Sequence, residues 1–140
     1  GLLKINQQIQ SNIPQQHEVI YLDKQYLKNI LFNLMSNAIK YSVEGTTVFC
    51  EIVIINTSNK TKNLIIKIKD EGIGIPKEDQ KHLFTRFFRA HNAENIQGTG
   101  LGLNIVRRYI DLMKGAIDFE SEMGIGSTFI VTIPLDNFEF

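Results

Sequence analysis

The chain has 140 residues, of which 43% are hydrophobic and 21% are charged, and these values are typical of one globular domain. Its 15 basic and 15 acidic side chains give a net charge of zero, which argues against a free-standing nucleic-acid-binding protein. The single cysteine excludes an internal disulfide, and no apolar run approaches the roughly 18 residues typical of a transmembrane helix. We therefore expect one domain over residues 1–140, with no nucleic-acid partner and no direct membrane contact.

The first part of the chain predicts two strands and one long helix. Residues 1–17 alternate weakly between apolar and polar, and residues 18–22 form a short apolar run, so each is a strand candidate. Asp23 is a good N-cap residue, and the apolar spacing behind it predicts a helix as far as about Ser42.

The remainder of the chain predicts two hairpins separated by helices. The predicted elements are strands over residues 46–57 and 64–69, a weak helix over 77–88, a helix over 101–113, and strands over 116–122 and 128–135. This mixed order favours an α/β sandwich in which helices cover one face of a single sheet.

Polar side chains border the apolar stripe of the predicted helix over residues 23–42. At about 100° per residue, one face carries Leu27, Ile30, Leu31, Leu34 and Ala38. Asn33, Asn37 and Lys40 lie together on the neighbouring strip, with Tyr41 between the two strips. Amide oxygens suit Mg²⁺ and a lysine can contact a phosphate. The strip is therefore either a solvated helix edge or the polar lining of a pocket.

A carboxylate ends the predicted strand over residues 64–69. Asp70 has the same parity as the apolar residues of that strand, so its side chain should point toward the apolar layer, where it needs hydrogen-bond donors. Gly72 and Gly74 remove side chains where the chain turns, so that another group can approach closely. Two interpretations stay open. Asp70 accepts backbone N–H groups in a turn, or it accepts an amino group such as the exocyclic amine of adenine.

The stretch GTGLGL, residues 98–103, joins a polar loop to a predicted helix. It follows no predicted strand, which excludes a Rossmann fingerprint, and it lacks the Gly-Lys-Ser/Thr ending of a Walker loop. A glycine loop at a helix N-terminus suits a polyphosphate and permits hinge motion. Alone, the stretch fits a flexible linker equally well.

Together these stretches identify a family. In order they are NLMSNAIKYS (33–42), DEGIGIP (70–76), LFTRFFR (83–89), GTGLGL (98–103) and GIGSTF (124–129). Over roughly residues 18–135 the chain resembles the ATP-binding catalytic domain of two-component sensor histidine kinases, in the superfamily that includes Hsp90, type II topoisomerases and MutL. The resemblance implies the Bergerat fold, a two-layer α/β sandwich with a mixed sheet of about five strands covered on one face by about three helices.

The resemblance also implies roles for individual residues. Asn37 is expected to coordinate Mg²⁺ between the phosphates of ATP, Asn33 to support the same region, and Lys40 to contact a phosphate, and these three are the expected catalytic residues. Tyr41 should pack against the adenine or the ribose. Asp70 should accept a hydrogen bond from the adenine amine.

Further nucleotide contacts are implied in the glycine stretches and in the phenylalanine-rich stretch. Phe84, Phe87 and Phe88 should anchor the lid, although their helical spacing also fits a plain core, and either Arg86 or Arg89 should contact the phosphates. The additional residues expected to bind the nucleotide are Gly72, Gly74, Ile75, Phe84, Arg89, Gly98, Thr99, Gly100, Leu101, Gly102, Leu103 and Thr128.

The activity implied is transfer of the ATP γ-phosphoryl group to a histidine on a separate dimerisation domain. None of His17, His82 and His91 begins the expected acceptor pattern, so we expect the chain to be a fragment that does not phosphorylate itself. Hydrolysing relatives carry a glutamate base four residues before the metal-binding asparagine. Asn33 occupies that position here, and an amide is not a base, which favours phosphotransfer over hydrolysis.

The expected partners are ATP, the histidine-containing domain preceding this one and a response regulator. The chain should be a monomeric cytoplasmic domain, and parents in the family are usually membrane-anchored. Three alternatives remain: an ATP-gated dimerisation module of the Hsp90/MutL kind, a serine kinase of the anti-sigma-factor type, and a non-catalytic nucleotide sensor.

Overall fold

The computed structural model of the protein describes residues 8–12, 22–57, 61–84 and 102–135. In chain order the elements are β1 (Gln8–Asn12), α1 (Lys24–Tyr41), β2 (Thr47–Asn56), β3 (Lys62–Asp70), the 3-10 helix η1 (Lys77–His82), α2 (Gly102–Leu112), β4 (Ala116–Glu122) and β5 (Gly126–Pro134). In the part of the chain that the structure describes, no helix is both long and apolar enough to cross a membrane.

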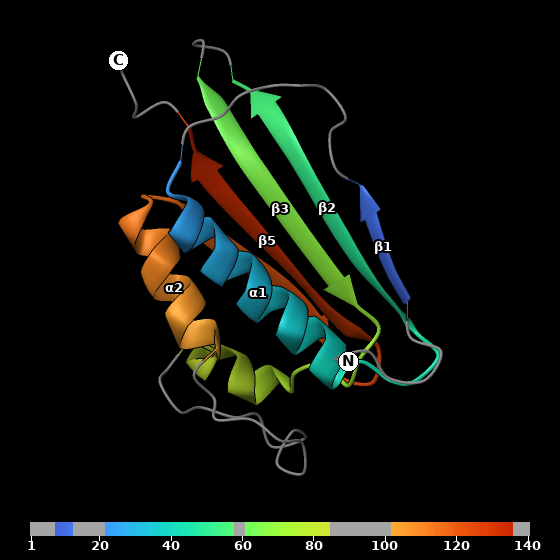
Figure 1. Cartoon of the computed structure of the whole chain (residues 1–140). Coiled ribbons are helices and arrows are strands. Elements are labelled where there is room, and N and C mark those ends of the chain that lie inside the picture. Colours follow the sequence, from blue (N-terminus) through green and yellow to red (C-terminus); the bar gives the residue numbers. More distant parts are fainter. Residues whose placement is uncertain (1–7, 13–21, 58–60, 85–101, 136–140) are drawn as a thin grey trace.

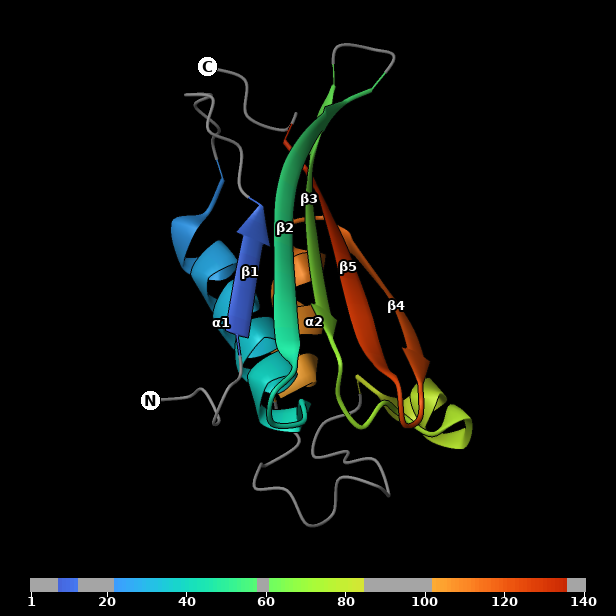
Figure 2. The ribbon, with the colours of Figure 1, turned by 90° about the vertical axis from the view of Figure 1, so that its right-hand side faces the viewer.

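The strands form one mixed sheet in the order β1-β2-β3-β5-β4. β1 runs parallel to β2, whereas β2–β3, β3–β5 and β5–β4 are antiparallel pairs. Helices α1 and α2 pack on each other and cover the same face of the sheet (Figures 1 and 2). The predicted two-layer sandwich with a mixed five-stranded sheet is therefore confirmed.

The hydrophobic core fills the space between the sheet and the helices. Alternate residues of the central strands β3 and β5 are buried because side chains alternate between the two faces of a strand. The buried core side chains on these two strands and on the helices are Leu64, Ile66, Ile68, Phe129, Val131, Ile133, Ile30, Leu34, Ala38, Ile39, Val106 and Ile110. The predicted apolar stripe of the long helix is confirmed, with Leu27 and Leu31 partly buried at its margin.

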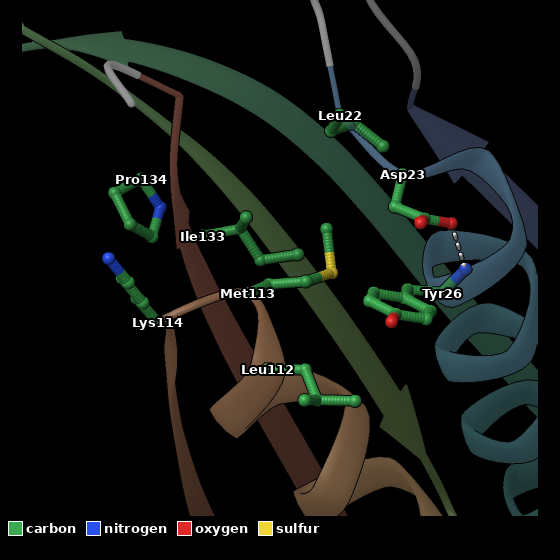
Figure 3. A pocket seen from close by; sticks show the side chains of 8 residues that line it. All are labelled: Leu22, Asp23, Tyr26, Leu112, Met113, Lys114, Ile133 and Pro134. Atoms are coloured by element: carbon green, nitrogen blue, oxygen red, sulfur yellow. Dashed lines mark hydrogen bonds between the residues drawn. The ribbon is translucent and has the colours of Figure 1, made fainter. Parts of the chain in front are cut away.

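The N-terminus of α1 confirms the predicted cap. The Asp23 carboxylate accepts a hydrogen bond from the Tyr26 amide at 3.0 Å (Figure 3). Beside this cap lies a pocket of about 400 Å³ between the start of α1, the end of α2 and the end of β5, which contains none of the residues predicted to bind a nucleotide.

Two predicted elements need correction, and a third lies almost entirely outside the described residues. In the segment predicted as a helix over residues 77–88, the described residues 77–84 form the short 3-10 helix η1 and a turn, and residues 85–88 lie outside the described ranges. The helix η1 follows Pro76 and has no side-chain N-cap bond. The last strand begins at Gly126 and not at residue 128, because Gly126 and Ser127 continue its ladder with β4 and β3. Of the strand predicted over residues 18–22, only Leu22 is described, and it lies outside the strands.

Candidate functional site

One end of the sheet brings together segments that lie far apart in the sequence. The last turn of α1, the end of β3 and the first turn of α2 all lie at this end (Figure 1). Ser42 forms an isolated antiparallel bridge with Gly72, and the Ile73 amide donates to the Tyr41 carbonyl oxygen at 3.1 Å. The Gly124 amide donates to the Ile73 carbonyl oxygen at 2.8 Å. The loop after β3 is therefore held between the end of α1 and the β4–β5 turn.

The two glycines of this loop, Gly72 and Gly74, allow close contact between backbone segments. A Cβ atom at Gly72 would lie 2.3 Å from the Tyr41 carbonyl oxygen, and one at Gly74 would lie 2.1 Å from the Glu122 carbonyl oxygen. Gly74 also has a φ of +69°, which favours glycine. The close approach predicted at these glycines is thus confirmed, and the groups that approach are the protein's own carbonyl groups.

Asp70 is buried at the end of β3, with the orientation that its parity predicts. Its side chain is 8% exposed, and Oδ1 accepts hydrogen bonds from the amides of Gly72 at 2.9 Å and Ser127 at 3.2 Å. Oδ2 accepts no hydrogen bond from the residues that the structure describes. Burial raises the pKa of Asp70 from 3.8 to about 6, although the two backbone hydrogen bonds lower it. The turn interpretation is confirmed for Oδ1, and Oδ2 remains available to a ligand donor.

The residue opposite Asp70 on β5 is Ser127, and not Thr128, which was the residue predicted from the sequence. Asp70 pairs with Ser127 across the β3–β5 ladder, whereas Thr128 pairs with Lys69. Because neighbouring residues on a strand point to opposite faces, Thr128 faces away from the helices, and Ser127 shares the buried face of Asp70. The parity of β5, with Phe129 buried, was the signal that could have identified Ser127 from the sequence.

Two asparagines of α1 face the start of α2. A Cβ atom at Gly102 would lie 3.3 Å from Asn37 Nδ2, 3.5 Å from Asn37 Oδ1 and 3.6 Å from Asn33 Oδ1. Asn33 Nδ2 donates to the Asn29 carbonyl oxygen at 2.7 Å, which orients this amide and leaves its oxygen toward Gly102. Two residues of the predicted polar strip, Asn33 and Asn37, therefore line the junction of the two helices, where the N-terminus of α2 carries partial positive charge.

The last turn of α1 adds a cation and an aromatic ring. Lys40 and Tyr41 are both half-buried, and Lys40 Nζ lies 5.6 Å from the centroid of the Tyr41 ring. At this distance the ring stabilises the ammonium group by a cation–π interaction. The end of α1 therefore presents positive charge next to the loop that follows Asp70.

Phe84 joins the phenylalanine-rich stretch to α2. Its ring packs against Phe119, with centroids 6.0 Å apart, and lies 5.7 Å from Arg107 Cζ. Its carbonyl oxygen accepts a hydrogen bond from Asn104 Nδ2 at 3.1 Å, a contact that sequence reasoning missed.

The other residues predicted to bind a nucleotide divide into two groups. Ile75 and Leu103 are half-buried and pack against the hydrophobic core. The residues that lie outside the described ranges are Arg86, Phe87, Phe88, Arg89, Gly98, Thr99, Gly100 and Leu101.

Comparison with known proteins identifies the family. The sequence model of one protein family, the histidine kinase-, DNA gyrase B- and HSP90-like ATPases, matches residues 22–137 of this chain. Sensor protein RprX of Bacteroides fragilis is 39% identical over 134 residues, covering 94% of this chain and 25% of RprX. Sensor histidine kinase WalK of Bacillus subtilis is 38% identical over 125 residues, covering 88% of this chain and 20% of WalK. The chain thus spans about a quarter or less of these relatives.

Solved structures agree with the sequence matches. The mycobacterial sensor histidine kinase MprB has a TM-score of 0.77 at 26% identity, over 92% of this chain and 84% of that one. Full-length ShkA, in complex with AMPPNP, has a TM-score of 0.73 at 26% identity, over 91% of this chain and 25% of ShkA. The chain therefore belongs to the histidine kinase-, DNA gyrase B- and HSP90-like ATPase family, as an ATP-binding catalytic domain of the sensor histidine kinase type.

Proposed function

We propose that the chain binds ATP at this end of the sheet and supplies its γ-phosphoryl group to a histidine side chain of a separate dimerisation domain. One juxtaposition carries the proposal. The side-chain amides of Asn33 and Asn37 face the start of α2, while Asp70 presents an unpaired oxygen, among the described residues, at the same end of the sheet. The similarity to ShkA, which was solved with AMPPNP, supports it.

The base-binding end centres on Asp70. Since two backbone amides occupy Oδ1, Oδ2 is the atom that would accept a hydrogen bond from the exocyclic amine of adenine. Ser127 shares this buried face, and Tyr41 supplies a half-buried ring on the neighbouring segment. A buried acceptor of this kind selects a base that carries an amino group, because a buried acceptor without a donor is costly.

The phosphate-binding end centres on the junction of α1 and α2. In general, the first turn of an α-helix has backbone N–H groups without partners inside the helix and carries partial positive charge, and both suit phosphate oxygens. Lys40, in the last turn of α1, would contact a phosphate from the neighbouring side.

The same junction fits Mg²⁺. Mg²⁺ prefers oxygen ligands and retains several waters, so a single amide oxygen from Asn37, supported by Asn33, is sufficient protein ligation beside the phosphates. When bound, the ion would neutralise charge on the phosphate oxygens. The chain's own contribution is to hold these amides, and Asn33 is fixed by its hydrogen bond to Asn29.

The proposed chemistry requires no base from this chain. The lone pair of a neutral imidazole nitrogen forms a bond to the γ-phosphorus, the bond from that phosphorus to the bridging oxygen breaks, and ADP leaves with the electron pair. The imidazolium product then loses its N–H proton to solvent. Asn33 holds the position where hydrolysing relatives would place a carboxylate base, and its amide does not take a proton from water. Positioning and charge neutralisation therefore provide the catalysis.

The proposed partners follow from this chemistry. The acceptor histidine lies on a dimerisation domain of the parent protein, and a response regulator receives the phosphoryl group from it. The isolated chain is proposed to be a monomeric cytoplasmic domain, because dimer contacts in this family belong to the other domain. Sedimentation showing a tight dimer without nucleotide would contradict this assignment.

Calorimetric titration tests the binding step. ATP and ADP, with and without Mg²⁺, are titrated into the wild type, Asp70→Ala and the matched control Asp118→Ala, whose exposed carboxylate lies on β4. Losing one hydrogen bond to a charged group costs about 1.5–3 kcal/mol, so Asp70→Ala should weaken ADP binding about 10- to 100-fold and Asp118→Ala should not. A folded wild type that binds no adenine nucleotide would refute the proposal.

A transfer assay tests the second step. The chain is incubated with ATP labelled at the γ-phosphate and a histidine-containing dimerisation domain supplied in trans. We expect acid-labile label on that domain, which disappears when its histidine is replaced by glutamine. Release of inorganic phosphate without labelled protein would instead identify an ATPase.

A further inference from the structure

The hydroxyl group of Ser121, on β4, joins three segments around the base-binding end. It accepts a hydrogen bond from the Ile75 amide at 2.8 Å, and its oxygen lies 2.7 Å from Ser127 Oγ and 3.2 Å from the Gly126 carbonyl oxygen. A serine hydroxyl has one proton to donate and two lone pairs that accept. If the Ser121 proton goes to Gly126, the Ser127 hydroxyl donates to Ser121 and every site on Ser121 is used. If it goes to Ser127, the Ser127 proton is free for another acceptor.

Gln80, on η1, holds the same loop from the other side. Its Nε2 donates to the Ile75 carbonyl oxygen at 3.1 Å and to the Ser121 carbonyl oxygen at 3.2 Å. Both polar backbone groups of Ile75 are therefore bound by side chains, the amide by Ser121 and the carbonyl by Gln80. Gln80 and Ser121 are half-buried, so these hydrogen bonds are partly shielded from water.

These contacts lead to Asp70, the carboxylate that is proposed to bind the base. Ser127, which pairs with Ser121 through the hydroxyls, donates its amide to Asp70 Oδ1. The second donor to the same oxygen is the Gly72 amide, which belongs to the loop whose other end is fixed at Ile75. Ser121 therefore contacts the residue that supplies one donor, Ser127, and the far end of the loop that supplies the other, and these two donors set the direction of Asp70 Oδ2.

We propose that Ser121 and Gln80 are positioning residues that determine the preference of this site for a base carrying an amino group. The inference rests on the proposed nucleotide binding. Neither side chain needs to touch the nucleotide. Removing one of them leaves the backbone contacts that dock the loop, from Ile73 to Tyr41 and from Gly124 to Ile73, so the fold is retained while the acceptor loses its fixed direction.

The test compares two nucleotides that differ at the base. ADP carries the exocyclic amine and inosine diphosphate carries a carbonyl oxygen in its place. Dissociation constants are measured by calorimetry for the wild type, Ser121→Ala, Ser121→Thr and Glu120→Ala. Glu120 is the matched control because it precedes Ser121 on β4 and its exposed side chain lies on the opposite face. Denaturant unfolding of each variant reports stability separately.

We expect Ser121→Ala to weaken ADP binding by about fivefold to tenfold, the equivalent of about one hydrogen bond at Asp70 Oδ2, and to change inosine diphosphate binding by less than about twofold. Ser121→Thr keeps the hydroxyl and should restore the preference, and Glu120→Ala should match the wild type. Equal weakening for both nucleotides, or no rescue by threonine, would overturn the proposal, because either result describes a general structural role.

Two further outcomes separate this inference from the proposed function. If the wild type binds neither nucleotide, the proposed function fails before any variant is considered. If Ser121→Ala does not fold, Gln80→Met tests the proposal in its place, because methionine keeps the length of the side chain and removes its hydrogen-bond donor. We expect Gln80→Met to reduce the ratio of the two dissociation constants about threefold or more. An unchanged ratio in that variant would reject the proposal.

Discussion

Replacing Asp70 by asparagine should stabilise the fold and reverse the base preference of the site. The two backbone donors at Oδ1, from Gly72 and Ser127, require an oxygen at that position. An asparagine side chain would satisfy both with its carbonyl oxygen, which places its NH₂ group where Oδ2 now lies. The variant therefore keeps both hydrogen bonds and exchanges the open acceptor for a donor.

The stability effect follows from the pKa of Asp70. Burial raises this pKa from 3.8 to about 6, so the folded state binds the proton more tightly than the unfolded state does. The stabilisation by the protonated form is complete below the unfolded pKa and is lost as the pH rises through about 6. The difference corresponds to about 3 kcal/mol at neutral pH. Asp70→Asn carries no charge, so its free energy of unfolding should exceed that of the wild type by up to about 3 kcal/mol above pH 6.

The assay is chemical denaturation between pH 4 and pH 8, with Asp118→Asn as the exposed control. We expect the difference between wild type and Asp70→Asn to vanish near pH 4 and to grow through pH 6, whereas the control shows no such growth. A variant that is less stable than the wild type at pH 7.5, or a difference independent of pH, would refute the assignment of a costly buried carboxylate.

The binding effect of the same variant has the opposite sign for adenine. The NH₂ group of asparagine would face the adenine amine, and two donors repel, so ADP affinity should fall by about 10-fold or more. Inosine diphosphate offers a carbonyl oxygen at that position and should bind the variant better than it binds the wild type. In the wild type, ADP affinity should decline as the pH falls below about 6, because protonated Asp70 loses its charge. An unchanged order of the two nucleotides in the variant would refute the proposed contact.

Two glycine substitutions test the geometry of the rest of the site. Gly102→Ala should reduce the affinity for Mg²⁺–ATP severalfold in calorimetry, because the added Cβ would lie 3.3 Å from Asn37 Nδ2. The unfolding free energy should be nearly unchanged, because a helix tolerates alanine at its start. An affinity equal to that of the wild type would show that the phosphates bind elsewhere. Gly74→Ala should lower the unfolding free energy by more than about 2 kcal/mol, since its Cβ would lie 2.1 Å from the Glu122 carbonyl oxygen, whereas Gly45→Ala, at a φ of +81° with no atom within 4 Å, should cost only about 1 kcal/mol. Equal losses in these two variants would show that φ alone, and not the close approach, requires glycine in the loop.

Local periodicity predicted much of this protein from the sequence. The N-cap at Asp23, the apolar stripe of α1 and the two hairpins follow from side-chain spacing, because helices and strands bury residues at periods of 3.6 and 2. The same parity predicted that Asp70 faces the core, and the order of the motifs identified the family that the comparisons confirm.

What only the tertiary structure decided are the contacts between segments that are distant along the chain. The Ser127 amide reaches Asp70 across 57 residues, and the Ile75 amide reaches the Ser121 hydroxyl across 46. The parallel pairing of β1 with β2 and the position of β5 between β3 and β4 are of the same kind. Such contacts depend on how the strands are ordered and how loops dock on one another, and side-chain spacing within a single element carries no information about either. The sequence by itself therefore determined most of the elements and most of the residues proposed to bind a nucleotide, and the packing of the loops decided which oxygen of Asp70 accepts the two backbone donors.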